Sequence, residues 1–291
     1  MQIGLTLPSF VPGVDRASIL EWCRRIDDGP FGSVSVGERI AYPNHEVVAT
    51  LAFAAAATER VRLVSTVAVL PSHDAVRFAK QMATIDVLSG GRLTVGVGVG
   101  GRESDYEAVG VPFARRFARL DEHVATLREV WQGKAVVDGL PPIGPEPVQP
   151  SGPPILTASM GPKSLARSAL WADGLAGWDL GPDPDGVDAT FRRVEDAWSA
   201  AGRTSRPWLT TSSWFALGDG AHDRLFGHAF DYLANFGDNA AHAMAGLCRL
   251  SDAGVLRETL AALRDTGCDE VVLVPTTTDI SEIDRLLAAL G

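Results

Sequence analysis

The sequence has few cysteines, few lysines and no long apolar run, and each shortage excludes a class of protein. Its three cysteines, Cys23, Cys248 and Cys268, are odd in number and far apart, so we expect free, buried thiols in a cytoplasmic protein. The six histidines form no HxxxH or HExxH pair and no CxxC occurs, so no metal site is expected. No apolar segment reaches the roughly 18 residues of a membrane helix, and we expect neither a membrane span nor a signal peptide.

Basic residues are also in short supply. The 26 lysines and arginines are outnumbered by 36 acidic residues, and the formal net charge of −10 argues against nucleic-acid or anionic membrane partners. The 291 residues are 46% hydrophobic and 21% charged, which is ordinary for a globular protein with a sizeable core. We therefore expect one α/β domain over residues 1–291 that acts on a small molecule.

What the sequence does contain is a strand–helix–strand unit over residues 61–110. Val61–Thr66 is short, apolar and rich in β-branched residues, which is typical of a strand covered on both faces. Asp74–Leu88 carries apolar residues at helical spacing and ends before a Gly-Gly turn. Leu93–Val99 is the next strand. Because the two strands run in the same direction, a parallel sheet with a right-handed crossover is predicted.

The same alternation of strands and helices extends over the whole chain. Eight strands and about eight helices predict a (β/α)8 TIM barrel with insertions, and an open doubly wound sheet is the alternative. An irregular insertion with a short hairpin is expected at about residues 133–153, and a helical insertion at about 219–252. The expected strands are Gln2–Leu7, Gly32–Val36, Val61–Thr66, Leu93–Val99, Pro154–Ser159, Asp173–Gly177, Trp208–Leu217 and Glu270–Pro275.

Glycines alternate with valines at the end of the strand Leu93–Val99. Because each glycine weakens a strand, the run of Gly96, Gly98, Gly100 and Gly101 needs a physical reason. For Gly96 and Gly98, inside the strand, we favour crowding against a bulky neighbour. For Gly100 and Gly101, beyond the strand, we favour the close approach of a large, flat ligand. The spacing differs from the dinucleotide fingerprint GxGxxG, because the third glycine is missing and no helix starts at once.

A second candidate binding segment, Ala158–Lys163, leads from a strand through a small-residue turn into a helix with a proline in its first turn. Free N–H groups at a helix N-terminus favour an anion and Lys163 adds positive charge, so a phosphate site is predicted; an ordinary capped loop is the alternative. No Ser–His–Asp or paired-carboxylate motif stands out. This scarcity suggests that a cofactor carries the chemistry. The acid–base candidates at the strand ends are Glu38, Arg39, His73 and Asp179.

Several segments resemble the bacterial luciferase-like superfamily of flavin- and deazaflavin-dependent oxidoreductases. The resemblance is most specific in ERVRLVSTVAVLPSHDAVRFAKQMATIDVLSGGRLTVGVGVGGRESDYEAVGVPFARRFARLDEHVATLREVW. It includes the segments QIGLTLP, GPFGSVSVGERIAYP, MGPKSLARSALWADGLAG and DTGCDEVVLVPTT. It covers residues 1–180 well and residues 180–265 loosely. The resemblance implies a (β/α)8 barrel, often dimeric, that binds FMN or coenzyme F420 at the carboxyl ends of its strands.

The resemblance also implies roles for particular residues. A bulge in the third strand of the family, which often contains a cis non-prolyl peptide behind the cofactor ring, matches Thr66, Val67 and Ala68. Glu38 and Arg39 would be catalytic and would orient the substrate or the reacting ring. The other implied cofactor contacts are Gly98, Val99 and Gly100 beside the ring or its side chain, and the backbone of Ala158, Ser159, Met160 and Gly161 at the phosphate, with Lys163 nearby.

The sequence departs from the family at three places. Many members carry a histidine in an acid–histidine pair after the second strand, where this chain has Glu38-Arg39. An arginine of some FMN enzymes falls at Val99, and a glutamate of some F420 enzymes falls near Gly101. The choice between the cofactors stays open. The expected activity is therefore that of an FMN-dependent monooxygenase or of an F420-dependent reductase or dehydrogenase.

Two other functions stay open at this stage. One is a non-catalytic flavin-binding relative, which would bind the cofactor without turnover. The other is an unrelated barrel enzyme for a phosphorylated substrate, which would need a lysine or carboxylate deep in a strand. None of the three lysines, Lys80, Lys134 and Lys163, lies in an expected strand. The expected partners are a small-molecule substrate, a separate flavin or F420 reductase, and a second copy of the chain in a homodimer.

Overall fold

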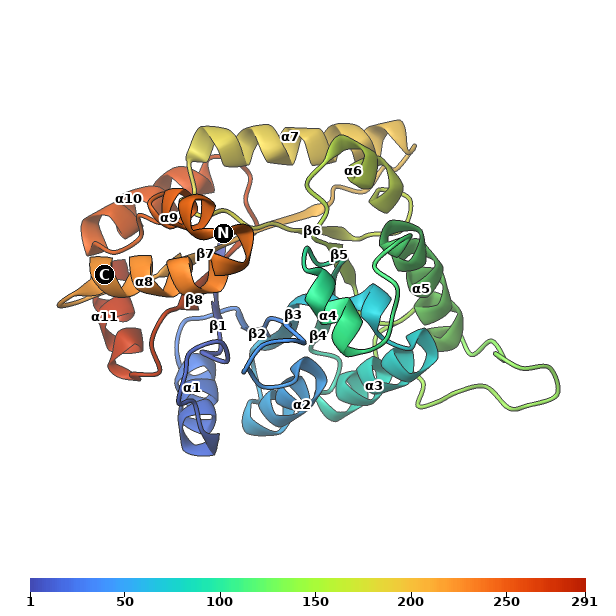
Figure 1. The fold of residues 1–291 in the computed structure, drawn as a ribbon. Coiled ribbons are helices and arrows are strands. Elements are labelled where there is room, and N and C mark those ends of the chain that lie inside the picture. The colour runs from blue at the N-terminus through green and yellow to red at the C-terminus, as the bar shows by residue number, and fades with distance from the viewer.

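The computed structural model describes residues 1–291 and contains a closed barrel of eight parallel strands in the order β1 to β8. Figure 1 shows the strands at the centre with the helices around them. Strand β1 pairs with both β2 and β8, which closes the barrel. The predicted (β/α)8 barrel is therefore confirmed, and the open doubly wound sheet is wrong. The strands are β1 (Gln2–Thr6), β2 (Ser33–Val36), β3 (Arg62–Val69), β4 (Leu93–Gly98), β5 (Ile155–Thr157), β6 (Gly174–Ala176), β7 (Trp208–Phe215) and β8 (Glu270–Pro275).

The helices between the strands pack their apolar faces on the outside of the barrel in one continuous core. Several begin at an acidic residue whose side chain accepts a backbone N–H group of the first turn, as at Asp15, Asp74, Asp183 and Asp252. The helices are α1 (Arg16–Asp28), α2 (Val47–Ala57), α3 (Ala75–Leu88), α4 (Glu103–Ala108), α5 (Arg116–Trp131), α6 (Pro162–Ser168), α7 (Pro184–Ala200), α8 (Ala221–Leu233), α9 (Asp238–Ala245), α10 (Ala253–Arg264) and α11 (Ser281–Leu290), with the short 3-10 helices η1 (Leu70–Ser72) and η2 (Ala234–Phe236).

The third strand is longer than predicted and irregular in its middle. The pairing of β3 with β4 shifts in register between Ser65 and Ala68. The peptide bond between Thr66 and Val67 is cis. Both the bulge and the cis non-prolyl peptide that the resemblance implies at Thr66–Ala68 are therefore confirmed.

Two glycines of β4 lie against this irregular segment. A Cβ atom on Gly96 would lie 2.1 Å from the carbonyl oxygen of Ser65, and one on Gly98 would lie 3.0 Å from Cγ2 of Val67. A side chain at position 96 would overlap backbone atoms that cannot rotate away. Crowding, as predicted, is the reason for both glycines inside the strand.

Residues 133–153 contain no strand, so the hairpin predicted there is wrong. Figure 1 shows the segment extending away from the barrel between α5 and β5. Its prolines have no N–H group to donate to a strand ladder, which disfavours paired strands. The end of the segment is fixed to α3 instead. There the buried carboxylate of Asp86 accepts the N–H groups of Val148 at 2.8 Å and Gln149 at 3.1 Å.

A short helix that the sequence pattern does not reveal follows β4. Helix α4 has the sequence ESDYEA, which is too short and too polar to show an apolar repeat. Its buried Tyr106 donates its hydroxyl group to the carbonyl oxygen of Val99 at 2.5 Å. The helix predicted from Phe113 begins later, because Arg115 adopts a left-handed backbone with φ of 59° immediately before α5.

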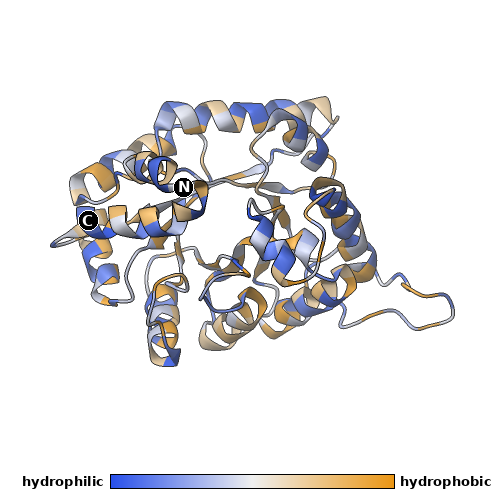
Figure 2. Cartoon of the chain, viewed as in Figure 1, coloured by the Kyte–Doolittle hydropathy of each residue, from blue (hydrophilic) through white to orange (hydrophobic).

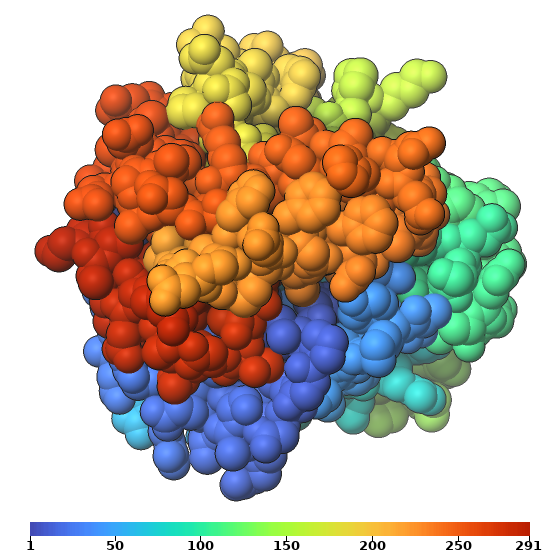
Figure 3. Space-filling view, turned by 60° about the vertical axis from the view of Figure 1, so that its left-hand side comes forward, coloured from blue at the N-terminus to red at the C-terminus, as the bar shows by residue number.

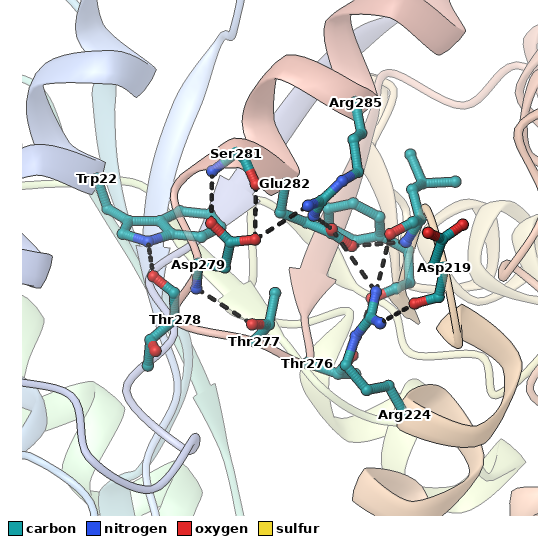
Figure 4. A network of polar contacts seen from close by, with 12 residues as sticks. Trp22, Asp219, Arg224, Thr276, Thr277, Thr278, Asp279, Ser281, Glu282 and Arg285 are labelled. Carbon is teal, nitrogen blue, oxygen red and sulfur yellow. Dashed lines mark hydrogen bonds and ion pairs between the residues drawn. The ribbon is translucent and has the colours of Figure 1, made fainter.

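The segment 219–252 is helical, as predicted, and consists of α8, η2 and α9. In Figure 3 the atoms of this insertion form a continuous orange band between the N-terminal residues in blue and α7 in yellow. The base of the insertion is fixed to α11 through Glu282, which is fully buried (Figure 4). The Glu282 carboxylate accepts a guanidinium N–H from Arg285 at 2.8 Å and lies 4.0 Å from Arg224 of α8. This ion-pair network holds the first turn of α8 against the barrel.

No helix of the structure is both long and apolar enough to cross a membrane. The three cysteines are free and buried, as predicted. Burial raises the pKa of the Cys23 and Cys268 thiols to about 12 and that of Cys248 to about 11. All three thiols are therefore protonated at neutral pH.

Candidate functional site

A cavity of about 420 Å³ opens at the carboxyl ends of the barrel strands. This is the end at which (β/α)8 enzymes carry their active sites, and the volume lies in the usual range for ligand pockets. The insertion covers part of it with Tyr232, Leu233, Phe236 and Met244. Six of the predicted site residues line the cavity: Glu38, Arg39, Thr66, Val67, Gly100 and Ala158.

Glu38 follows β2 and is held by two groups from the end of β3. Its side chain is only 4% exposed. The Oε2 atom accepts the Val69 N–H at 2.6 Å, and Nε2 of His73 lies 2.9 Å from Oε1. The ring of His73 packs against Phe78. His73, one of the acid–base candidates, therefore reaches Glu38 from another element, the turn after η1.

Arg39 points into the same cavity but has a different partner. Its guanidinium carbon lies 4.7 Å from the ring centroid of Tyr42 and 5.4 Å from that of Tyr232. Its Nε atom lies 3.4 Å from Oδ2 of Asp105 on α4. The other carboxylate oxygen of Asp105 accepts the N–H groups of Ile40 and Ala41 at 3.2 and 2.8 Å, which fixes the loop that carries Arg39.

Arg102 connects the end of β4 to the insertion across the cavity. Its Nε donates to Oδ1 of Asn235 at 3.1 Å, and its Nη2 donates to the carbonyl oxygen of Tyr232 at 3.2 Å. The guanidinium carbon lies 4.7 Å from the Tyr232 ring centroid. Burial lowers the pKa of Arg102, although the group remains a cation at neutral pH.

The end of β4 also gives the cavity a stretch of wall without side chains. A Cβ atom on Gly101 would meet nothing within 4 Å, so a flat ligand has room to approach its backbone. Gly100 has a φ of +61°, and a Cβ atom there would lie 2.9 Å from Cγ1 of Val69. Gly101 therefore fits the predicted approach of a ligand, whereas Gly100 is also required by its own backbone conformation.

The remaining predicted cofactor contacts lie outside the lining of the cavity. Ala68 and Gly98 are buried in the barrel wall, and Val99 packs against the core. Beyond Ala158 the chain turns outward, so that Met160, Gly161 and Lys163 are exposed at the start of α6, with Ser159 half-buried before them.

Two of the predicted phosphate donors already have acceptors within the protein. The Ala158 N–H donates to the carbonyl oxygen of Val97 at 2.9 Å, and the Ser159 N–H donates to Oγ1 of Thr157 at 3.2 Å. The N–H groups of Met160 and Gly161 have no such acceptor, and no side chain caps α6. The phosphate site stays a prediction, with Met160, Gly161 and Lys163 as its remaining donors.

Two further titratable groups lie close to the cavity without lining it. Asp179 follows β6, and its Oδ1 accepts the Gly181 N–H at 3.0 Å; burial raises the pKa of this carboxyl group. His228 of α8 lies behind Trp214, with the two ring centroids 5.6 Å apart. Burial lowers the pKa of His228 to about 4, so the ring is neutral at pH 7.

Sequence reasoning assigned no role to four residues that shape the cavity. Arg102 and Trp178 stand at strand ends that the pattern did locate, but nothing in the pattern distinguishes them from solvent-exposed neighbours. Asp105 belongs to the unpredicted helix α4. Tyr232 lies in the insertion, where only its place among apolar residues of an amphipathic helix could have drawn attention.

The chemistry of these groups fits a large cofactor with a flat ring. The backbone and side chains of Thr66 and Val67, together with Gly101, offer a wall with little charge. Glu38 with His73 can hold and move a proton, and Arg39 can donate hydrogen bonds. None of these side chains can accept two electrons, so a redox reaction here needs a bound group.

Comparison with known proteins identifies the family. The family described as luciferase-like monooxygenase matches residues 1–278. An uncharacterised protein of Mycobacterium tuberculosis is 37% identical over 167 residues, which are 55% of this chain and 58% of that protein. The pyrimidine monooxygenase RutA of Escherichia coli is 32% identical over 142 residues, which are 45% of this chain and 38% of RutA. The match to this chain spans about half the length of these curated relatives or less.

Solved structures share the fold over the whole chain. Monooxygenase RslO1 from Streptomyces bottropensis has a TM-score of 0.77 at 22% identity, with 100% of both chains covered. An F420-dependent secondary alcohol dehydrogenase in complex with an F420–acetone adduct has a TM-score of 0.77 at 19% identity, with 100% of this chain and 99% of that chain covered. At these identities the likeness establishes the fold alone.

Proposed function

The chain belongs to the luciferase-like monooxygenase family of oxidoreductases, and on this premise we propose that it uses FMN or coenzyme F420 to oxidise or reduce a small organic substrate. The cofactor would supply the two-electron chemistry, as a monooxygenase with FMN and O₂ or as a reductase or dehydrogenase with F420. Structures of both kinds of enzyme share this fold, so the fold does not discriminate between the two cofactors, and a binding experiment is needed.

One observation carries the proposal. The irregular part of β3 at Thr66-Val67 and the bare backbone of Gly101 line the same cavity as the acid Glu38 and the cation Arg39. A flat ring has apolar surface to lie against, and two ionisable side chains are within the same space. This combination suits a redox cofactor with a substrate beside it better than it suits a single small substrate.

The acid–base work in this proposal belongs to Glu38 and His73. Glu38 is nearly buried, lines the cavity and contacts His73, whose side chain is 18% exposed. A proton taken from a bound substrate at a Glu38 oxygen has a direct route to Nε2 of His73 and so toward solvent. The Val69 N–H fixes the carboxylate for this transfer.

The phosphate of the cofactor would lie at the start of α6. The N–H groups of Met160 and Gly161 and the ammonium group of Lys163 are the donors that the chain offers there. Ala158 lines the cavity immediately before them, so the chain leads from the proposed ring site to the proposed phosphate site without a break.

The proposal is tested by titrating the purified protein separately with FMN and with F420 and following fluorescence. Tight binding of FMN, followed by O₂ consumption with the reduced cofactor, supports the monooxygenase. Tight binding of F420 with weak binding of FMN supports the reductase or dehydrogenase. Binding without any turnover of reduced cofactor supports a non-catalytic relative, and binding of neither contradicts the proposal.

A matched pair of variants shows whether the cavity is the binding site. Gly101→Val places a side chain in the open wall and should weaken cofactor binding about tenfold or more, since even 1.4 kcal/mol corresponds to that factor. Gly227→Val is the control, because Gly227 on α8 also has nothing within 4 Å of its Cβ position and does not line the cavity. Equal affinities of both variants would place the cofactor elsewhere.

A further inference from the structure

The cavity contains a buried cation whose hydrogen-bonding groups are unused. The side chain of Arg39 is only 7% exposed, yet its guanidinium group makes no hydrogen bond with the protein. Its Nε atom is buried without an acceptor. Its charged partner is Asp105, whose Oδ2 atom lies 3.4 Å from Nε. Burial of polar groups without hydrogen bonds is costly, and native proteins rarely leave such groups without a purpose. The Arg39 guanidinium group therefore keeps N–H donors for which the chain itself provides no hydrogen-bond acceptor.

The neighbouring acid does not satisfy this cation. Asp105 comes no closer to Arg39 than 3.4 Å, and one of its oxygens is already shared between the N–H groups of Ile40 and Ala41. The other acid of the cavity, Glu38, is engaged with Val69 and His73. Two tyrosine rings, Tyr42 and Tyr232, pack against the guanidinium group, whose carbon lies 4.7 and 5.4 Å from their centroids.

A second arginine side chain packs against the ring of Tyr232. Arg102 stacks on Tyr232 as Arg39 does, and its two hydrogen bonds go to the uncharged oxygens of Asn235 and the Tyr232 backbone. No carboxylate forms an ion pair with Arg102. Two arginines and two carboxylates, those of Glu38 and Asp105, line the cavity, in a chain whose overall charge is −10. The two arginines are the cationic donors that the cavity offers to an anionic group.

The rest of this side of the cavity is apolar and aromatic. Phe10, Trp178, Trp214, Phe236 and Met244 line it, and Trp178 contacts Trp214 edge to face with centroids 4.7 Å apart. A ligand that satisfies the whole surface needs an apolar body and one anionic end.

We infer that the substrate is an organic acid, whose carboxylate is bound by Arg39, with Arg102 beside it, and whose apolar body lies against the tryptophans and the insertion. This inference rests on the proposed function, because it assigns the space beside the cofactor to the substrate. The planar fork of an arginine matches the two oxygens of a carboxylate, which gives the site orientation as well as affinity. The proposed phosphate site lies after β5, on a different strand end from Arg39, so the two anionic groups do not compete.

The test compares acids with amides of the same shape. The probes are phenylacetate against phenylacetamide and hexanoate against hexanamide, titrated by calorimetry at millimolar concentrations into the cofactor-saturated protein. Each acid should bind about tenfold or more tightly than its amide, because a hydrogen bond to a charged group contributes that much. Arg39→Gln should remove this preference.

Further variants keep the result interpretable. Arg39→Lys keeps the charge but not the fork and should retain only part of the preference for the acid. If Arg39→Gln fails to fold, Arg102→Gln should still reduce the preference, by less. Equal binding of acid and amide to the unmodified protein, or no binding of either acid, would overturn the inference. So would weakened cofactor binding in Arg39→Gln with acid binding intact.

The failure of this inference differs from failure of the proposed function. If neither FMN nor F420 binds, the proposed function fails, whereas the acid–amide comparison on the cofactor-free protein still reports whether Arg39 selects a carboxylate. If a cofactor binds and the acid preference is absent, only the substrate class is wrong.

Discussion

The Nε2 atom of His73 lies between the two carboxylate oxygens of Glu38, 2.9 Å from Oε1 and 3.0 Å from Oε2. One ring nitrogen of His73 thus contacts both oxygens of an acid that lines the cavity. The pair joins the end of β2 to the turn after η1.

Replacement of Glu38 by Gln should lower turnover about 100-fold, because a positioned general acid or base contributes that order of rate enhancement. Circular dichroism should show an intact fold. The measurement is reoxidation of the reduced cofactor in the presence of substrate. Asp179→Asn is the control, because Asp179 also follows a strand and is partly buried but does not line the cavity; its turnover should stay within about twofold. Similar losses in both variants would argue against a role for the pair.

Replacement of Gly96 by Ala should destabilise the barrel by about 2 kcal/mol or more, since overpacking against a fixed backbone forces the strands apart. The new Cβ atom would lie 2.1 Å from the Ser65 carbonyl oxygen. Urea unfolding measures the free-energy change. Gly101→Ala, with nothing within 4 Å, should unfold with the midpoint of the unmodified protein. An unchanged midpoint for Gly96→Ala would contradict the pairing of β3 with β4.

His228 should make the protein less stable in mild acid. Burial lowers the pKa of this histidine from 6.5 to about 4 in the folded protein, so the unfolded chain binds a proton that the folded chain does not. The stabilising contribution is therefore present above pH 6.5 and is lost as the pH falls from 6.5 toward 4. Between pH 7 and pH 5 this loss is about 2 kcal/mol.

The contribution of His228 is measured by urea unfolding at these two pH values in the unmodified protein and in His228→Leu. The variant should lose about 2 kcal/mol less than the unmodified protein between pH 7 and pH 5. His222→Leu, which removes an exposed histidine from the same helix, should keep the full dependence. Parallel curves for all three proteins would show that His228 titrates normally.

The expected homodimer stays a prediction, and we propose that it forms through the outer face of helix α2. Its sequence VVATLAFAAAA has no charged residue, and Figure 2 colours the helix mostly as hydrophobic. Ala49 and Ala56 are exposed on it. A helix that is apolar all round is usually buried. Light scattering should give a dimer for the unmodified protein and a monomer for Ala56→Glu.

The matched control for the dimer is Ala200→Glu, which places the same charge on the exposed outer end of α7. That variant should remain a dimer. A monomeric unmodified protein would show that the outer face of α2 is not an interface between copies.

The local part of the site could be predicted from the sequence, and the long-range part could not. The glycines of β4 stand out in the sequence itself, and the resemblance to the family implied the bulge at Thr66–Ala68. The atoms that crowd Gly96 belong to Ser65, 31 positions away, and are known only from the structure. The contact between Glu38 and His73 joins residues 35 positions apart, and Arg102 meets Asn235 across 133 positions. The spacing of apolar and polar residues along the sequence does not predict such contacts, because they form only when the barrel closes.

Fold prediction failed for the same physical reason in two segments. Helix α4 was missed because six mostly polar residues show no repeat, although the packing of Tyr106 stabilises it. The hairpin at 133–153 was predicted from turn residues alone, whereas the segment is fixed by Asp86 on a distant helix. In both places tertiary contacts decide the conformation.

The insertion contributes its share of the cavity in a single stretch of chain, from Tyr232 to Met244, attached to the barrel at the end of β7 and before α10. Every strand of the barrel can therefore stay as it is while this stretch is exchanged for another. A transplanted cover is therefore a practical way to alter what this barrel accepts.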